Sequence, residues 1–193
     1  MRIHAFLPVI AILALPACTA TIPPVEVTRF HGNDAIAPGA ITTGPIAGQD
    51  GNTIEFRTYA LAVSRELGRL GFTEGTNASY TAEIGYSRNA RELVAKSSPI
   101  TIGIGGGSFG SHVGVGLGTS FGIGGDRSNQ IITSRLEVRI KRSGDALIVW
   151  EGRAQTEAMS NAPAAQPGLA ADKLSRALFS GFPGESGKTI IVP

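Results

Sequence analysis

The sequence feature that most constrains the fold is a pair of neighbouring segments in which apolar and polar side chains alternate. Residues 131–141 form the first segment, residues 146–155 form the second, and Ser-Gly-Asp at 143–145 connects them. A two-residue period places successive side chains on opposite faces of a strand, and a short connection containing Gly favours antiparallel pairing. The two segments therefore predict a half-buried β-hairpin.

Two more segments show the same alternation. Residues 25–30 and 78–88 are predicted strands, whereas residues 31–51 are rich in Gly, Pro, Ala and Asn and are expected to form a loop. The apolar tail at 188–193 is compatible with an added edge strand.

Two helices are predicted between and after these strands. In residues 52–70 apolar side chains recur at three- and four-residue spacing, and Asn52 or Thr53 can cap the N-terminus. Residues 169–179 form a shorter helix that ends in a sequence rich in Gly and Pro. The order of elements predicts an α+β fold, an antiparallel sheet with two helices packed on one face.

Residues 1–17 are predicted to form a cleaved export signal. A basic start containing Arg2 precedes an apolar run at 5–15, and a small residue lies before the expected cleavage site. The run of eleven residues is shorter than the ~20 apolar residues that a membrane-spanning helix needs.

The end of this leader resembles a bacterial lipobox, at which a secreted protein is cut and its new N-terminal cysteine is acylated. The four residues are Leu15, Pro16, Ala17 and Cys18. The resemblance implies acyl chains on Cys18 that anchor the chain to a membrane, because two or more such chains give stable binding. Residues 18–24 are then a lipidated tether, and 25–193 a single α+β domain. The alternative is an ordinary signal peptide that has a cysteine near its end.

The residue after Cys18 bears on the final location. Asp at this position is the familiar inner-membrane retention signal of enteric bacteria, and this chain has Thr19 instead. We therefore expect a lipid-anchored protein of the cell envelope, held in the outer membrane and facing the periplasm.

Composition argues against several classes of ligand. The chain has 17 Lys and Arg against 15 Asp and Glu, without a dense basic stripe, so nucleic acid is not an expected partner. Its single cysteine allows no intramolecular disulfide and no thiolate metal cluster. His31 and His112 lie far apart and lack acidic clusters beside them, so no metal site and no cofactor is expected.

Residues 103–125 contain eleven glycines and match several motifs. The dinucleotide pattern that starts at Gly105 lacks the helix that such a site requires. Two G-x-S-x-G matches, at Ser108 and Ser120, lack the later His of a hydrolase triad. Gly at every fourth position suits a packing face between membrane helices, whereas the alternation of Gly with Ile and Val favours a hairpin. We expect the hairpin, as a mobile connection or as a surface that another backbone or a lipid can approach.

Other residues that suggest chemistry have structural explanations. Gly-Lys-Thr at 187–189 lacks the first Gly of a P-loop and the helix that must follow. Glu83 and Glu137 lie in predicted strands and are expected to face solvent or pair with Arg. Trp150 is expected in the core, with a part in a site as the alternative. No catalytic residue is therefore nominated.

Three segments resemble bacterial lipoproteins that carry domain of unknown function 4136. They are the helix end and strand at 67–86, the Trp-x-Gly strand at 148–154, and the C-terminal helix with its Phe-Pro stop at 174–183. The resemblance covers about residues 25–183, and it departs from the family at Ser79-Tyr80, where Asp is common. It implies the fold and an envelope location, and it carries no activity.

Together these observations lead us to expect a non-enzymatic envelope lipoprotein that acts as a binding or structural accessory. Its expected partners are the membrane, through the acyl chains on Cys18, and an envelope protein. One alternative is a periplasmic hydrolase of envelope polymers, whose site only tertiary contacts would assemble. Another is a module that inserts residues 103–125 into a membrane or a partner assembly.

Overall fold

The computed structural model describes residues 23–93 and 130–193. The elements are β1 (Val25–His31), β2 (Ala40–Pro45), α1 (Ile54–Arg69), β3 (Thr73–Glu74), β4 (Tyr80–Glu92), β5 (Gln130–Arg142), β6 (Ile148–Met159), a short 3-10 helix η2 (Pro163–Ala165), α2 (Pro167–Phe179) and β7 (Thr189–Val192). The predicted export signal at 1–17 and the Gly-rich segment at 103–125 lie outside the described residues.

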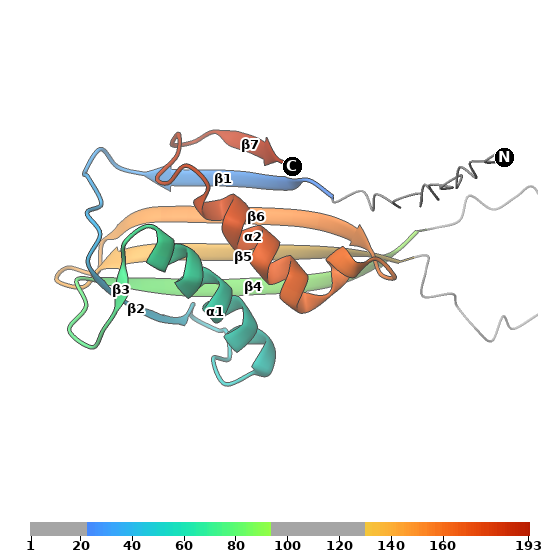
Figure 1. The fold of residues 1–193 in the computed structure, drawn as a ribbon, viewed down its shortest axis with the longest axis horizontal. Helices are drawn as coiled ribbons and strands as arrows, with labels where there is room; N and C mark the ends of the chain where they lie inside the picture. The colour runs from blue at the N-terminus through green and yellow to red at the C-terminus, as the bar shows by residue number, and fades with distance from the viewer. Residues whose placement is uncertain (1–22, 94–129) are drawn as a thin grey trace, which may run out of the picture.

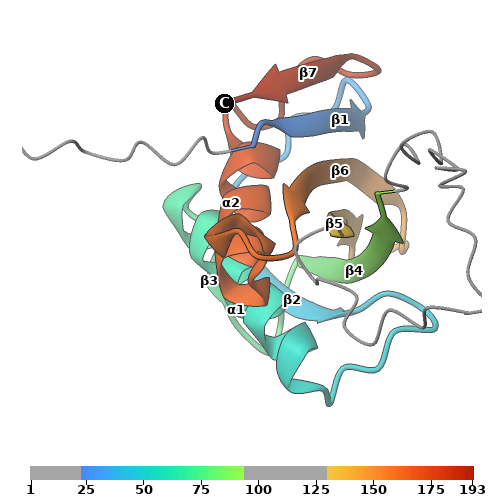
Figure 2. The ribbon, with the colours of Figure 1, turned by 90° about the vertical axis from the view of Figure 1, so that its right-hand side faces the viewer.

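Seven strands form one sheet in the order β3-β2-β4-β5-β6-β1-β7 (Figure 1). Figure 2 shows α1 and α2 together on one side of the sheet, and in the described part of the chain no helix covers the other side. The expected α+β fold with two helices on one face is therefore confirmed. We call the two sides the helix face and the open face.

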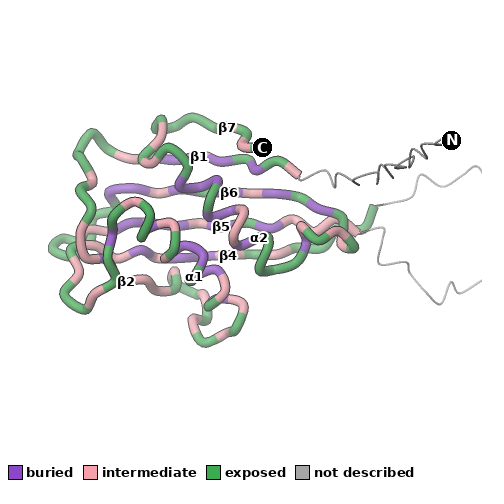
Figure 3. The backbone as a smooth tube through the Cα atoms, in the orientation of Figure 1, coloured by how far each residue is buried: buried purple, intermediate pink, exposed green. Residues whose placement is uncertain are grey.

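The predicted hairpin is the centre of the sheet. β5 pairs antiparallel with β6 and with β4, so the three longest strands lie side by side. Burial alternates along each of them, as Figure 3 shows for the backbone. The alternation arises because apolar side chains point toward the helices while the intervening polar side chains point away from them.

One expectation about the chain before α1 is wrong. Residues 31–51 were expected to be a loop, but they contain β2, which runs parallel to both β3 and β4. Helix α1 supplies the crossover between β2 and β3 that neighbouring parallel strands require. The Gly and Pro at the end of β2 hide it in the sequence, because both residues are typical of loops. The tail does form an edge strand, β7.

Helix α1 begins and packs as its sequence predicts. The Thr53 side chain accepts a hydrogen bond of 3.0 Å from the backbone N–H of Phe56, so Thr53 is the cap. The buried side chains on this helix are Phe56, Tyr59, Ala62, Val63 and Leu67. An ion pair of 2.8 Å between Arg65 and Asp172 joins the exposed edges of the two helices.

The Trp-x-Gly sequence of β6 has a steric explanation. Trp150 is fully buried, stacks on Phe179 with ring centroids 5.3 Å apart, and donates its indole N–H to the Pro183 carbonyl at 3.0 Å. A Cβ atom at Gly152 would lie 2.3 Å from a Trp150 ring carbon and 2.8 Å from Leu178. Glycine is therefore what lets the indole lie across its own strand. The expected core position of Trp150 is confirmed.

A buried arginine ties β1 to the end of α2. The Arg29 guanidinium donates to the carbonyl oxygens of Ala177, Leu178 and Ser180 at 2.8, 2.8 and 2.9 Å. These groups belong to the C-terminal turn of a helix, where carbonyls lack intrahelical partners and a cation is favoured. Burial lowers the pKa of Arg29 from its ordinary value. Gly184, at φ +87°, leaves the space that the Arg29 side chain occupies.

Candidate binding trough on the open face

The open face carries polar side chains that face one another across neighbouring strands. The register rows are Glu83–Arg139–Glu151–Phe30, Gly85–Glu137–Arg153–Thr28 and Ser87–Arg135–Gln155–Glu26. In the first two rows carboxylates and guanidinium groups alternate from strand to strand. Opposite charges placed in this way stabilise strand pairing by about 0.2–1 kcal/mol per pair.

Ion pairs hold these rows together. Lys141 Nζ lies 2.6 Å from Glu83 Oε1, and Arg139 lies 2.6 Å from Glu137 and 3.8 Å from Glu151. Glu137 therefore pairs with Arg as the sequence indicates, while Glu83 pairs with Lys instead. All five of these side chains are half-buried, so their positions are more restricted than those of freely exposed charges.

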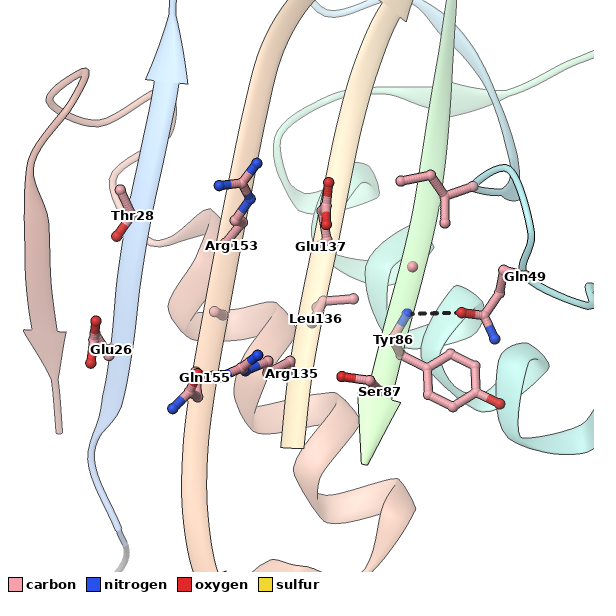
Figure 4. Close-up of a pocket in the computed structure, with 13 residues that line it drawn as sticks. Glu26, Thr28, Gln49, Tyr86, Ser87, Arg135, Leu136, Glu137, Arg153 and Gln155 are labelled. Atoms are coloured by element: carbon pink, nitrogen blue, oxygen red, sulfur yellow. Dashed lines mark hydrogen bonds between the residues drawn. The ribbon is translucent and has the colours of Figure 1, made fainter. Parts of the chain in front are cut away.

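A trough of about 530 Å³ crosses the open face over four adjacent strands. Figure 4 shows its labelled side chains on β1, β4, β5 and β6, with Gln49 from the chain after β2. Small residues at Thr28, Gly85 and Ser87 leave the space, and longer side chains stand around it. The volume falls within the range of roughly 300–1,000 Å³ that is typical of small-molecule sites.

One wall of the trough comes from the segment between β2 and α1. A Cβ atom at Gly85 would lie 2.9 Å from Ile46 Cγ2, so glycine at this position lets the Ile46 side chain pack over β4. Gln49 accepts a hydrogen bond of 3.3 Å from the backbone N–H of Tyr86 (Figure 4). The amide of Gln49 thereby satisfies a strand edge group beyond the end of β2.

The opposite wall supplies hydrogen-bonding groups of several kinds. Arg135 Nε donates to Gln155 Oε1 at 2.6 Å, which places a guanidinium beside an amide on neighbouring strands. Arg153 pairs with Glu151 outside the trough, and the carboxylates of Glu26 and Glu137 also line it. Such a surface can donate to and accept from a polar ligand, because guanidinium groups only donate and carboxylates only accept.

A second hollow, of about 400 Å³, adjoins the trough. It shares Glu26 and Gln155 with the trough and is also lined by Pro23, Pro24 and Glu157. The polar surface therefore continues from the middle of the sheet to the point where the described chain enters β1.

A second polar cluster lies under the helices. Tyr59 is fully buried and stacks on Tyr86 with ring centroids 4.6 Å apart, and burial raises the pKa of Tyr59 to about 12. Arg88 lies 3.5 Å from Glu55 and donates to the Ala165 carbonyl at 2.6 Å. The cluster therefore joins α1 and η2 to the end of β4.

The residues predicted to carry the anchor are not placed by the structure. Leu15, Pro16, Ala17 and Cys18 lie outside the described residues, as do Ser108, His112 and Ser120. His31 lies at the end of β1, where its ring nitrogens contact the carbonyl oxygens of Gly32 and Gly184 at 2.8 and 3.0 Å. Over residues 23–93 and 130–193, no group of His, Cys, Asp and Glu is arranged to hold a metal ion.

Sequence reasoning did not find the trough. The sequence did contain one indication of it: Arg and Glu side chains occupy every second position of the central hairpin and mark one polar face. The contributions of Gln49 and Glu26 had no such signal, because they depend on long-range placement of β1 and of the segment after β2. Neither α1 nor α2, the two long helices of the described ranges, has the length and apolar character to cross a membrane.

The fold and the trough define a small α+β protein whose sheet leaves a polar face open. The chain belongs to the family of a Zymomonas mobilis protein designated "Uncharacterized protein ZMO1243", to which it is 30% identical over 210 residues. The alignment covers 86% of this chain and 79% of that protein. No protein-family model matches the chain, so the likeness to domain of unknown function 4136 stays a prediction from short motifs.

Solved structures show only distant likeness. A PDZ domain protein from Parabacteroides distasonis matches with a TM-score of 0.49 and 12% identity, over 89% of this chain and 39% of that one. A PelC dodecamer from Paraburkholderia phytofirmans matches with a TM-score of 0.46 and 9% identity, over 84% of this chain and 99% of that one. Likeness at this level carries no argument about function.

Proposed function

We propose that this protein is a lipid-anchored accessory of the cell envelope that binds a polar ligand in the trough of its open face. The observation that carries the binding role is the trough itself, a space of about 530 Å³ lined by guanidinium, carboxylate and amide groups. The anchor rests on the sequence around Cys18.

The trough is suited to binding because its groups stand on paired strands rather than on a loop. Arg135 donates a hydrogen bond to Gln155, and Glu137 forms an ion pair with Arg139, at 2.6 Å in both cases. Because strand pairing already orders the backbone at these positions, a ligand has only side chains left to order, and such ordering is a cost of binding.

The anchor is tested by substituting Cys18 with Ala in cells and following the protein by fractionation and by incorporation of an alkyne fatty acid. We expect the wild type to be labelled and membrane-bound, and the variant to be unlabelled and released. A Thr19→Ala variant, which keeps the cysteine, is the matched control. A Cys18→Ala protein that stays in the membrane fraction would show that the anchor hypothesis is wrong.

The trough is tested by filling it. Ser87 is exposed within the trough, and Arg57 is exposed on α1 on the other side of the sheet, so a Trp at each position makes a matched pair. Crosslinking in intact cells followed by mass spectrometry identifies what contacts the protein. We expect Ser87→Trp to abolish the adducts and Arg57→Trp to preserve them, and equal adducts from both variants would refute binding in the trough.

Hydrolysis of envelope polymers is the second candidate, because two carboxylates, Glu26 and Glu137, line the same trough. Purified protein incubated with isolated envelope polymer distinguishes the two functions. Release of soluble fragments that is lost in Glu26→Gln or Glu137→Gln would favour the hydrolase. Binding without release, weakened by Ser87→Trp, would favour the accessory.

A further inference from the structure

The open face changes character at one end. Across β4, β5 and β6 its side chains are polar or absent in the rows from Gly85 to Asn89, but in the next row Ile131 stands between Arg91 and Met159. Leu93 follows directly after the end of β4. Leu93 is 42% exposed and Met159 is 37% exposed. We call these three side chains, Leu93, Ile131 and Met159, the apolar edge.

The predicted tether leaves the domain at this same end. The Pro24 carbonyl accepts a hydrogen bond of 2.9 Å from Thr156, and Pro24 lines the second hollow together with Glu157. Met159 lies two residues beyond Glu157 on β6. In Figure 1 β1 begins, and β4 and β6 end, toward the right-hand end of the sheet.

The length of the tether decides which end of the domain can meet a membrane. Six residue steps separate Cys18 from Pro24, and a fully extended chain of that length spans roughly 20 Å. The thirteen residues of β5 make the sheet about 44 Å long. An acyl-anchored domain therefore holds the apolar edge near the lipid, while its far end reaches lipid only if the domain lies flat.

Apolar exposure alone does not select an end. Leu147 and Ile148, at the far end of β6, are 53% and 42% exposed. The position of the tether distinguishes the two ends, because Pro23 and Pro24 line a hollow with Glu157 of β6, at the end of the sheet that holds the apolar edge.

We infer that the apolar edge is a membrane-contact surface, with Leu93 and Met159 entering the boundary between lipid headgroups and acyl chains. Exposed apolar side chains gain free energy at that boundary when an anchor already holds them there. The inference rests on the proposed anchor, and it adds an orientation: the strands stand on the bilayer with the 143–147 turn pointing away from it.

Single-cysteine labelling tests the orientation. Cys18 is the one cysteine of the chain and is consumed by acylation in the proposed protein, so an introduced thiol can be labelled uniquely. Leu93→Cys and Met159→Cys report on the apolar edge, and Leu147→Cys, at a more exposed leucine, is the matched control. Each acylated full-length protein carries a polarity-sensitive fluorophore in phosphatidylethanolamine and phosphatidylglycerol vesicles with brominated acyl chains.

We expect a blue shift and loss of fluorescence at positions 93 and 159, and no change at 147. Equal quenching at all three positions, or quenching at 147 alone, would overturn the inference. Flotation of the vesicles separates this outcome from failure of the anchor. Protein that floats without quenching at 93 and 159 keeps the anchor and loses the orientation, whereas protein that does not float overturns both.

Discussion

The two faces of the sheet are built from the same strands, yet they hold different kinds of residue. On the helix face Arg29 is 4% exposed and Gly152 lies beside it in register, under the Trp150 indole. Thr28 and Arg153 are the next register pair along the same two strands, and they lie on the open face and line the trough. Because adjacent positions serve opposite faces, the helix face should govern stability and the open face should govern binding.

The largest loss of unfolding free energy is expected when Arg29 is substituted. Arg29→Ala removes three charge-assisted hydrogen bonds and leaves the carbonyls at the end of α2 without a donor, which costs about 4 kcal/mol of unfolding free energy. Arg153→Ala, on the neighbouring strand of the open face, should cost no more than ~0.5 kcal/mol because its side chain is 57% exposed. Urea denaturation measures both, and equal losses would contradict the division between the faces.

The second-largest loss of stability is expected when Gly152 is substituted. In Gly152→Ala the new methyl group meets the Trp150 ring at 2.3 Å, and overpacking of this kind costs about 3 kcal/mol. Gly144→Ala, with nothing within 4 Å, is the control and should stay within ~0.5 kcal/mol of wild type. Thermal unfolding followed by tryptophan fluorescence reports both stability and the packing of Trp150, and an unchanged midpoint in Gly152→Ala would refute the steric role of this glycine.

The raised pKa of Tyr59 predicts a loss of folding stability at high pH. Its folded pKa of about 12 lies above the ordinary value of 10, so the fold favours the neutral phenol. This stability is complete below pH 10 and declines from pH 10 to about 12 as the unfolded chain ionises, by about 2 kcal/mol in total. Tyr59→Phe should flatten the curve in that range, as measured by denaturation at a series of pH values. A Phe variant with the same slope as wild type would contradict the prediction.

The smallest effect concerns the ion pairs of the open face. A double-mutant cycle with Glu83→Ala and Lys141→Ala should give a coupling free energy of about 0.5–1 kcal/mol, because the pair is half-buried and in contact at 2.6 Å. The coupling should weaken in high salt. A coupling free energy larger than the unfolding free energy lost in Arg29→Ala would reverse the proposed roles of the two faces.

The sequence predicted the helix face better than the open face, for a physical reason. Period-two and period-3.6 patterns identify apolar side chains that must be buried, and so they located α1, β5, β6 and Trp150. The pattern missed β2, whose Gly44 and Pro45 are typical of a loop and whose pairing is parallel. Local patterns report burial, while the partners of a strand depend on tertiary contacts.

The trough depends on those tertiary contacts even more. Alternating Arg and Glu on β5 and β6 indicated a polar face, but nothing local showed that Ile46 packs over Gly85 or that β1 brings Glu26 beside Gln155. The glycine of β4 is explained only once its long-range neighbour is known. Residues that create space on a surface are therefore harder to recognise in a sequence than residues that fill a core.

Site-specific photo-crosslinking in living cells tests the central claim, that the open face is the binding surface, most directly. A photoreactive residue is placed at Thr28 in the trough, at Ser87 in the trough, or at Arg57 on α1. We predict one shared adduct from Thr28 and Ser87 and none from Arg57. An adduct from Arg57 alone, or none from either trough position while the protein is folded and at the membrane, would contradict the account.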